Sequence, residues 1–147
     1  MSDKLTNKPD ENRLKVILCR PDKRAEVIEI EDSLEKMQEL VGGMIEEYMP
    51  FEDDVALVCN DEGKMMGMPL NRSIRDESGR TQDIIAGDFF ICYAPIESEN
   101  FLSLPPDLEK KYKEKFDYPE QFFRVDGVIE GINFDPKPPK EQSVSAR

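Results

Sequence analysis

The fold is decided by residues 14–43, which read LKVILCRPDKRAEVIEIEDSLEKMQELVGG. The run from Leu14 to Cys19 is apolar, and the run from Ala25 to Glu31 alternates between apolar and acidic residues. Alternation with a period of two is typical of a half-buried strand. Because residues 20–24, RPDKR, are turn formers, we expect the two runs to pair as an antiparallel hairpin.

A helix is predicted directly after this hairpin. Asp32 is suited to cap its first turn, with Glu35 three residues later in an Asp variant of the capping box. Gly42 and Gly43 are expected to end the helix, because glycine adopts the left-handed conformation past a helix terminus without strain. The expected buried stripe consists of Leu34, Met37, Leu40 and Val41.

Further strands are expected along the chain. Residues 44–49 form a possible strand that stops at Pro50, and residues 55–59 form a short apolar run typical of a central strand. Residues 64–68 are expected to return as its hairpin partner, followed by a long loop over residues 69–83. The second strong strand signal covers residues 84–94, with Gly87 as a bulge or a point of close backbone approach.

A second helix is expected over residues 107–116, beginning at one of the two prolines that precede it. Its apolar residues recur at every fourth position, at Leu108, Tyr112 and Phe116. Two aromatic residues that follow the helix are expected to dock back on the core, Phe122 and Phe123.

The elements together predict a single α+β domain over residues 14–134. The sheet is expected to be mostly antiparallel, because most connections are hairpins, with two helices against one face. The flanking residues are polar or proline-rich. We therefore expect a flexible lead over residues 1–13 and a disordered tail over residues 135–147.

The composition limits the possible chemistry. The chain has 147 residues and no histidine, which excludes Ser-His-Asp, Cys-His and His-metal sites. Cys19, Cys59 and Cys92 lie far apart in apolar runs, so we expect free buried thiols rather than disulfides or zinc ligands. No apolar stretch is long enough to span a membrane, and the N-terminus lacks the apolar core of a signal peptide. A cytoplasmic protein without membrane contact is expected.

The formal net charge of −12 is concentrated in one segment. Residues 26–62 carry 13 acidic residues against one base, Lys36, whereas the rest of the chain is balanced. Side chains at alternate positions of a β-strand point to the same face and are about 7 Å apart, which is close to the spacing of phosphates along a DNA strand. We therefore predict a partner-binding acidic surface formed by Glu29, Glu31, Glu35, Glu39, Glu46 and Glu47. A solvated face that only serves solubility is the alternative.

No reaction is indicated by the motifs. The sequence has no glycine-rich phosphate loop and no calcium-loop pattern, and among 32 acidic residues a pair of carboxylates is uninformative. We expect no enzymatic activity, no catalytic residues, no metal and no cofactor. Direct binding of nucleic acid is not expected, because its affinity comes mainly from lysine and arginine neutralising phosphates.

A second candidate region lies between Met65 and Arg72. Its methionines, Met65, Met66 and Met68, are either core-filling residues or an adaptable contact surface. Asn71 and Arg72 follow a proline in the expected loop, where they hydrogen-bond neighbouring carbonyls or contact a partner. The alternative partner-binding set is Asn71, Arg72 and Asp88.

Three stretches of the sequence resemble one family. They are residues 60–64 (NDEGK), the group Gly67, Pro69 and Asn71-Arg72, and residues 85–90 (IAGDFF). In this order they resemble domain of unknown function 3846, a family of small proteins of bacteriophages and integrative elements in Gram-positive gut bacteria. The resemblance covers about residues 14–123 and brings no catalytic residues. It implies accessory cargo of mobile DNA, often encoded beside antirestriction and conjugation functions.

Three functions remain open. The first is a non-enzymatic, counter-defence protein that inhibits a host restriction, CRISPR or other nucleic-acid-binding protein through a DNA-mimicking acidic surface. Its partner is a host or element protein with a basic surface. The second is an accessory adaptor of the mobile element that binds through residues 65–72. The third is a small-ligand binder or enzyme with a pocket near Asn71, Arg72 and Asp88.

Overall fold

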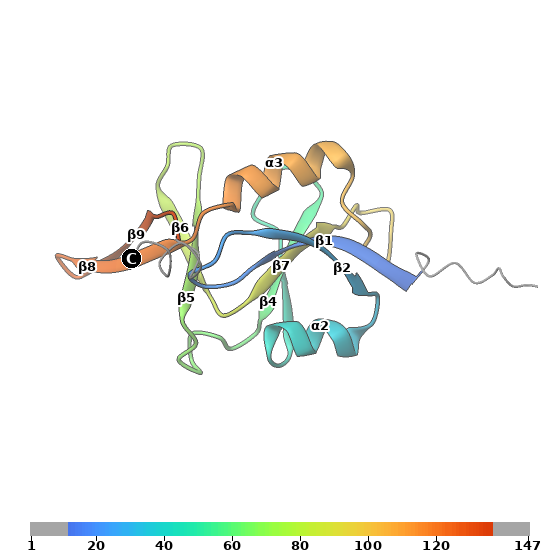
Figure 1. The fold of residues 1–147 in the computed structure, drawn as a ribbon, viewed down its shortest axis with the longest axis horizontal. Coiled ribbons are helices and arrows are strands. Elements are labelled where there is room, and N and C mark those ends of the chain that lie inside the picture. The colour runs from blue at the N-terminus through green and yellow to red at the C-terminus, as the bar shows by residue number, and fades with distance from the viewer. Residues whose placement is uncertain (1–11, 137–147) are drawn as a thin grey trace, which may run out of the picture.

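A computed structural model describes residues 12–136, which form two helices and nine strands (Figure 1). The main element is a five-stranded antiparallel sheet in the order β2-β1-β7-β4-β3. Its strands are β1 (Arg13–Cys19), β2 (Glu26–Glu31), β3 (Ile45–Tyr48), β4 (Val55–Asn60) and β7 (Phe89–Tyr93). The antiparallel hairpin predicted from residues 14–31 is confirmed as β1 and β2.

The two helices, α2 (Leu34–Val41) and α3 (Pro106–Phe116), cover opposite faces of this sheet (Figure 1). Met37 of α2 packs in one core, and Tyr112 of α3 packs in the other. The prediction that both helices cover one face is therefore wrong. The physical reason is that the central strands bury consecutive residues, as in Val16 and Ile17 of β1, so both faces need a covering layer.

Two further hairpins stand beside the main sheet at one end (Figure 1). The first pairs β5 (Leu70–Arg75) with β6 (Thr81–Ala86), and the second pairs β8 (Glu120–Val125) with β9 (Val128–Asn133). A buried carboxylate joins them: Glu120 accepts hydrogen bonds from the Ser73 main-chain N–H at 3.0 Å and from its hydroxyl at 2.6 Å. The predicted loop over residues 69–83 is therefore wrong, because most of it forms a hairpin.

The structure corrects three other expectations. Residues 64–67 form turns and Met68 is in no regular element, instead of a strand paired with β4. The predicted strand over residues 84–94 is two strands of different sheets, separated at Gly87, whose φ of +85° turns the chain. The expected docking of the aromatic pair is also wrong, since Phe122 and Phe123 lie in β8 outside both cores, and Phe123 is 48 % exposed.

The helices begin and end close to the expected residues. The cap of α2 is Ser33 rather than Asp32: its hydroxyl accepts from the Lys36 N–H at 3.1 Å. Gly42 ends α2 in the left-handed conformation, as predicted. The buried residues of α2 are Met37 and Val41, whereas Leu34 is 57 % exposed.

The remaining expectations concern cysteines, membrane spans and termini. The three cysteines are free and buried, as predicted. Neither helix within residues 12–136 is long and apolar enough to cross a membrane. The expected lead and tail fall almost entirely on residues 1–11 and 137–147, which lie outside the described residues.

Candidate functional site

The six glutamates of the predicted acidic surface do not share one face. Glu29 and Glu31 lie on β2, where their cross-strand neighbours on β1 are Lys15 and Arg13. Glu46 and Glu47 lie on β3, at the opposite edge of the sheet and on its two different faces. The remaining pair, Glu35 and Glu39, belongs to α2. A single row of six carboxylates is therefore excluded by the strand order.

Arg72 of the alternative set is fully buried and serves the fold. Its guanidinium donates to the Phe116 carbonyl at the end of α3 from Nε (3.0 Å) and to the Lys23 carbonyl from Nη2 (2.7 Å). Nη1 donates to the side-chain oxygen of Asn71 at 2.7 Å and to the Arg20 carbonyl at 3.2 Å. Arg72 thus joins the β1–β2 turn to the C-terminus of α3, where a cation also complements the helix dipole.

The donors of this cluster are used within the protein. Asn71 is also buried, and its amide donates to the carbonyls of Cys19 at 3.0 Å and Gly87 at 2.8 Å. Burial lowers the pKa of Arg72, because desolvation disfavours the charged form. Of the two open interpretations of Asn71 and Arg72, the structure supports carbonyl binding, and only Asp88 of that set is accessible to a partner.

Next to this cluster in sequence, residues 61–68 form an exposed segment that we term the methionine turn. Asn60 positions its start: its amide donates to the Val41 carbonyl at the end of α2, and its oxygen accepts from the Glu62 N–H. Gly63 lies against β6, since a Cβ there would come within 2.7 Å of the Ala86 carbonyl oxygen. The turn is therefore held at both sides, while Met65 and Met66 remain exposed.

The methionines of this turn are mostly outside the core. Met65 is 87 % exposed and Met66 is 57 % exposed. Met68 is half-buried and packs over Gly42 and Gly87. Of the two open interpretations, core filling is wrong for Met65 and Met66. Flexible thioether side chains on a surface are suited to contact partners of varied shape.

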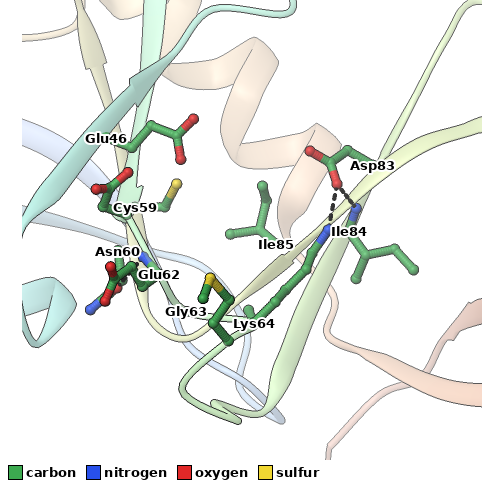
Figure 2. A pocket seen from close by; sticks show the side chains of 12 residues that line it. Glu46, Cys59, Asn60, Glu62, Gly63, Lys64, Asp83, Ile84 and Ile85 are labelled. Carbon is green, nitrogen blue, oxygen red and sulfur yellow. Dashed lines mark hydrogen bonds and ion pairs between the residues drawn. The ribbon is translucent and has the colours of Figure 1, made fainter.

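A first hollow, the acidic hollow, lies on one side of the methionine turn (Figure 2). It has a volume of about 170 Å³ and is formed by the ends of β4 and β6, the turn and a side chain of β3. Its charged lining consists of Glu46, Asp61, Glu62, Asp83 and one base, Lys64. Lys64 donates to Asp83 at 2.8 Å (Figure 2). Because Lys64 is already paired with Asp83, the other three carboxylates have no basic partner among the lining residues.

The electrostatics of this hollow disfavour thiol chemistry. Burial raises the pKa of Cys59 to about 11, and the negative charges of Glu46, Asp83 and Asp61 add to this shift. A protonated thiol is a poor nucleophile and a poor metal ligand. In the part of the chain that the structure describes, no group of three or more acidic or cysteine side chains is placed to hold a metal ion.

A second hollow, the apolar hollow, lies on the other side of the methionine turn and has a volume of about 440 Å³. Leu40, Val41, Met68 and Pro69 supply much of its wall, and two carboxylates stand in its lining, Glu39 and Asp88. Burial raises the pKa of Asp88, opposed by the charge of Arg20, whose Nε is 4.0 Å from the carboxylate. The structure thus brings Glu39 of the first predicted set together with Asp88 of the second.

The residues that sequence reasoning missed are those brought in by hairpin β5–β6. Asp83 reaches the acidic hollow because β6 runs beside the turn, whereas the sequence predicted a loop there. Met68 and Pro69, which line the apolar hollow, were within the Met65–Arg72 region that the sequence had indicated. The available signal was the pair of short runs LNRSIR and TQDIIA on either side of residues 76–80, DESGR, because a five-residue connection that contains glycine is typical of a hairpin.

The comparisons with known proteins give one match. The family model described as Domain of unknown function (DUF3846) matches residues 14–117, more than half of the chain. The chain belongs to this family. No curated protein and no solved structure matches the chain.

The residues matched by the DUF3846 model include the methionine turn and all of the hydrogen-bond acceptors of Arg72, from the Arg20 carbonyl to the Asp117 carbonyl. Hairpin β8–β9 begins at Glu120 and therefore follows the matched region. The methionine turn is thus part of the matched family domain, and the second hairpin lies outside the matched residues.

Proposed function

We propose that this protein is a non-enzymatic interaction protein that binds a basic surface of a partner protein through the methionine turn and the carboxylates around it. The observation that supports this proposal is the charge of the two hollows beside the turn. Their linings hold six carboxylates, and the only base among the lining residues is Lys64. The carboxylates are Glu39, Glu46, Asp61, Glu62, Asp83 and Asp88.

The chemistry of this surface favours a protein partner. Exposed carboxylates attract lysine and arginine, and such charges accelerate association and select the partner. Methionine side chains between the carboxylates add apolar contact area that adapts to the partner. Direct binding of nucleic acid is disfavoured, because a chain of net charge −12 repels phosphates.

The finer proposal concerns the kind of partner. Resemblance to proteins of mobile elements suggests a cytoplasmic counter-defence role against a nucleic-acid-handling protein, whose DNA-binding surface is basic. The strand order limits this proposal to one part of the predicted acidic set. Glu39 and Glu46 border the methionine turn, whereas Glu29 and Glu31 lie on the opposite edge strand.

A small-ligand function has less support. The acidic hollow, at about 170 Å³, is below the roughly 300–1,000 Å³ of ordinary ligand pockets, and the apolar hollow, at about 440 Å³, is lined by Asp88 but by neither Asn71 nor Arg72. Arg72 and Asn71, the residues that would bind such a ligand, are buried and already hydrogen-bonded. The adaptor hypothesis uses the same methionine turn and differs only in the identity of the partner.

The test is affinity capture from a bacterial host lysate with a charge-reversed variant. The variant carries Glu46→Lys, Asp61→Lys and Glu62→Lys, three exposed residues of the acidic hollow. We expect a basic protein to bind the natural chain at about 50 mM salt, to elute near 300 mM, and to be lost with the variant.

The matched control makes the same change in charge elsewhere on the surface. It carries Glu97→Lys, Glu99→Lys and Glu114→Lys, which are exposed and line neither hollow. Capture that survives in the control and fails in the first variant supports the proposal. Equal capture by both variants, or retention unaffected by salt, contradicts it. Circular dichroism verifies that both variants remain folded.

A further inference from the structure

The apolar hollow adjoins another one. A hollow of about 540 Å³ lies between the β1–β2 turn and hairpin β8–β9, and its lining includes Leu70, Phe122 and Phe123. It shares Pro21 and Pro69 with the apolar hollow. The two hollows therefore meet at these prolines. We call the combined feature the proline groove, which runs from α2 to the second hairpin.

The lining of the proline groove combines apolar side chains with carboxylates. Its apolar residues are Pro21, Leu40, Val41, Met68, Pro69, Leu70, Phe122 and Phe123. The acidic residues are Glu39, Asp22, Asp88 and Glu120, of which Glu120 is buried and hydrogen-bonded to Ser73. Within the described residues, neither lining includes a lysine or arginine. Arg20 approaches from outside and makes only a weak, exposed pair with Asp88.

We propose that the proline groove binds an extended segment of a partner protein, in which apolar side chains alternate with lysine or arginine. This inference rests on the proposed function and names the form of the partner. An extended chain directs successive side chains to opposite sides. Apolar side chains then enter the groove, while the long basic side chains on the outer side bend back to the solvent-accessible carboxylates of Glu39, Asp22 and Asp88.

The shape of the groove favours an extended segment over a folded surface. Its two parts are open hollows that follow one another past a pair of prolines, so a chain lying along them contacts both. Proline has no N–H donor, which leaves no donor at this junction to be desolvated by an apolar ligand. At the far end Phe123 is 48 % exposed, which leaves an aromatic surface for the partner.

The test is a titration of the isotope-labelled full chain, followed by backbone amide NMR. The probes are two synthetic peptides of equal length and charge, one alternating lysine and leucine and the other alternating lysine and serine. We expect the lysine–leucine peptide to shift the amide signals of Gly42, Gly87 and Phe123. It should bind about tenfold more tightly than the lysine–serine peptide, because only leucine buries apolar area.

Two variants examine the two ends of the groove. Asp88→Asn removes a carboxylate at the α2 end, and Phe123→Ser removes the aromatic ring at the hairpin end. Each is expected to weaken the lysine–leucine peptide at least about threefold. The control Phe101→Leu changes a half-buried aromatic residue that lines neither hollow and is expected to leave the affinity unchanged.

The outcomes separate this inference from the proposed function. Equal affinity for both peptides, or shifts confined to residues 61–64, overturns the groove while leaving the acidic surface as the binding site. Absence of binding by either peptide counts against both proposals. Self-association of the chain with shifts of the groove signals, in the absence of peptide, makes a second copy the occupant and overturns the inference.

Discussion

The Arg72 cluster and the methionine turn adjoin each other in sequence but use their polar residues in opposite ways. Arg72 and Asn71 are 0 % exposed, and their donors are bound to carbonyls of the same chain. Asp61 and Glu62 are exposed, and their carboxylates face solvent beside the acidic hollow. The type of residue does not distinguish the two roles. Their difference follows from the strand that carries one pair into the core and the turn that leaves the other outside.

The largest expected effect comes from removing the buried guanidinium. Arg72→Met is expected to lower the free energy of unfolding by about 3–5 kcal/mol, because the carbonyls of Phe116, Lys23 and Arg20 lose their donor in a buried site. Urea denaturation measures the loss. The control Arg124→Met concerns an exposed arginine, for which a change within about 0.5 kcal/mol is expected. Equal losses of unfolding free energy in Arg72→Met and Arg124→Met would contradict the structural role of the buried guanidinium.

A smaller loss is expected at the junction between the regions. Gly87→Ala places a Cβ 2.7 Å from the Met68 sulfur at a φ of +85°, so both backbone strain and a clash oppose it. We expect a loss of about 2–3 kcal/mol. The control Gly79→Ala has a similar φ of +89° with nothing within 4 Å, and is expected to cost about 1 kcal/mol. The difference between the two thermal midpoints isolates the contact with Met68.

A pH-dependent contribution is expected from Asp117, beside the Arg72 cluster. Hydrogen bonds from Arg24, and then from Lys113, hold the pKa of Asp117 below its usual 3.8. Its ionised form therefore stabilises the fold fully above the unfolded pKa, and this contribution disappears as the pH falls through the lower folded pKa. Asp117→Asn is expected to reduce stability by about 1 kcal/mol at pH 7 and by less below pH 3. A loss independent of pH would contradict this origin.

The smallest effect on stability is expected in the methionine turn itself. Met65→Gln with Met66→Gln changes two exposed side chains, so the free energy of unfolding should change by less than about 0.5 kcal/mol. Capture of a basic partner should weaken severalfold in the same variant, because the apolar contact area is lost. A destabilisation like that of Arg72→Met would show that the turn belongs to the structural region instead.

Local sequence signals predicted the elements with clear hydrophobic patterns. The β1–β2 hairpin, α2 and α3 were predicted close to their observed bounds. Hairpin β5–β6 was missed because β5 buries Asn71, Arg72 and Ser73 at positions where an apolar residue would have signalled a strand. Hairpin β8–β9 was missed for the opposite reason: it exposes apolar residues such as Val125 and Val128, at 53 % and 57 %. Patterns of hydrophobicity predict burial only where burial is apolar.

The sequence predicted that acidic residues dominate this part of the surface, but it did not predict which of them lie together. The excess of acidic residues over 26–62 correctly indicated that carboxylates dominate the surface of this part of the chain. Which of them lie together depends on the order of strands, and β2 and β3 stand at opposite edges of the sheet. Asp83 and Asp88 come from outside that segment and meet Glu46 and Glu39 only through tertiary pairing. The spacing of residues within one segment does not predict contacts of this kind between distant segments.

The three buried cysteines allow local opening of the core to be measured by thiol labelling. Burial raises the pKa of Cys19 to about 12 and that of Cys59 to about 11, so neither thiol reacts readily in the native state. Cys19 and Cys59 belong to the core beneath α3, whereas Cys92 belongs to the core beneath α2. A thiol reagent therefore labels each position at a rate set by the separation of its own layer. The opening rates of the cores on the two faces of the sheet can therefore be measured separately, with only the natural cysteines as labelling positions.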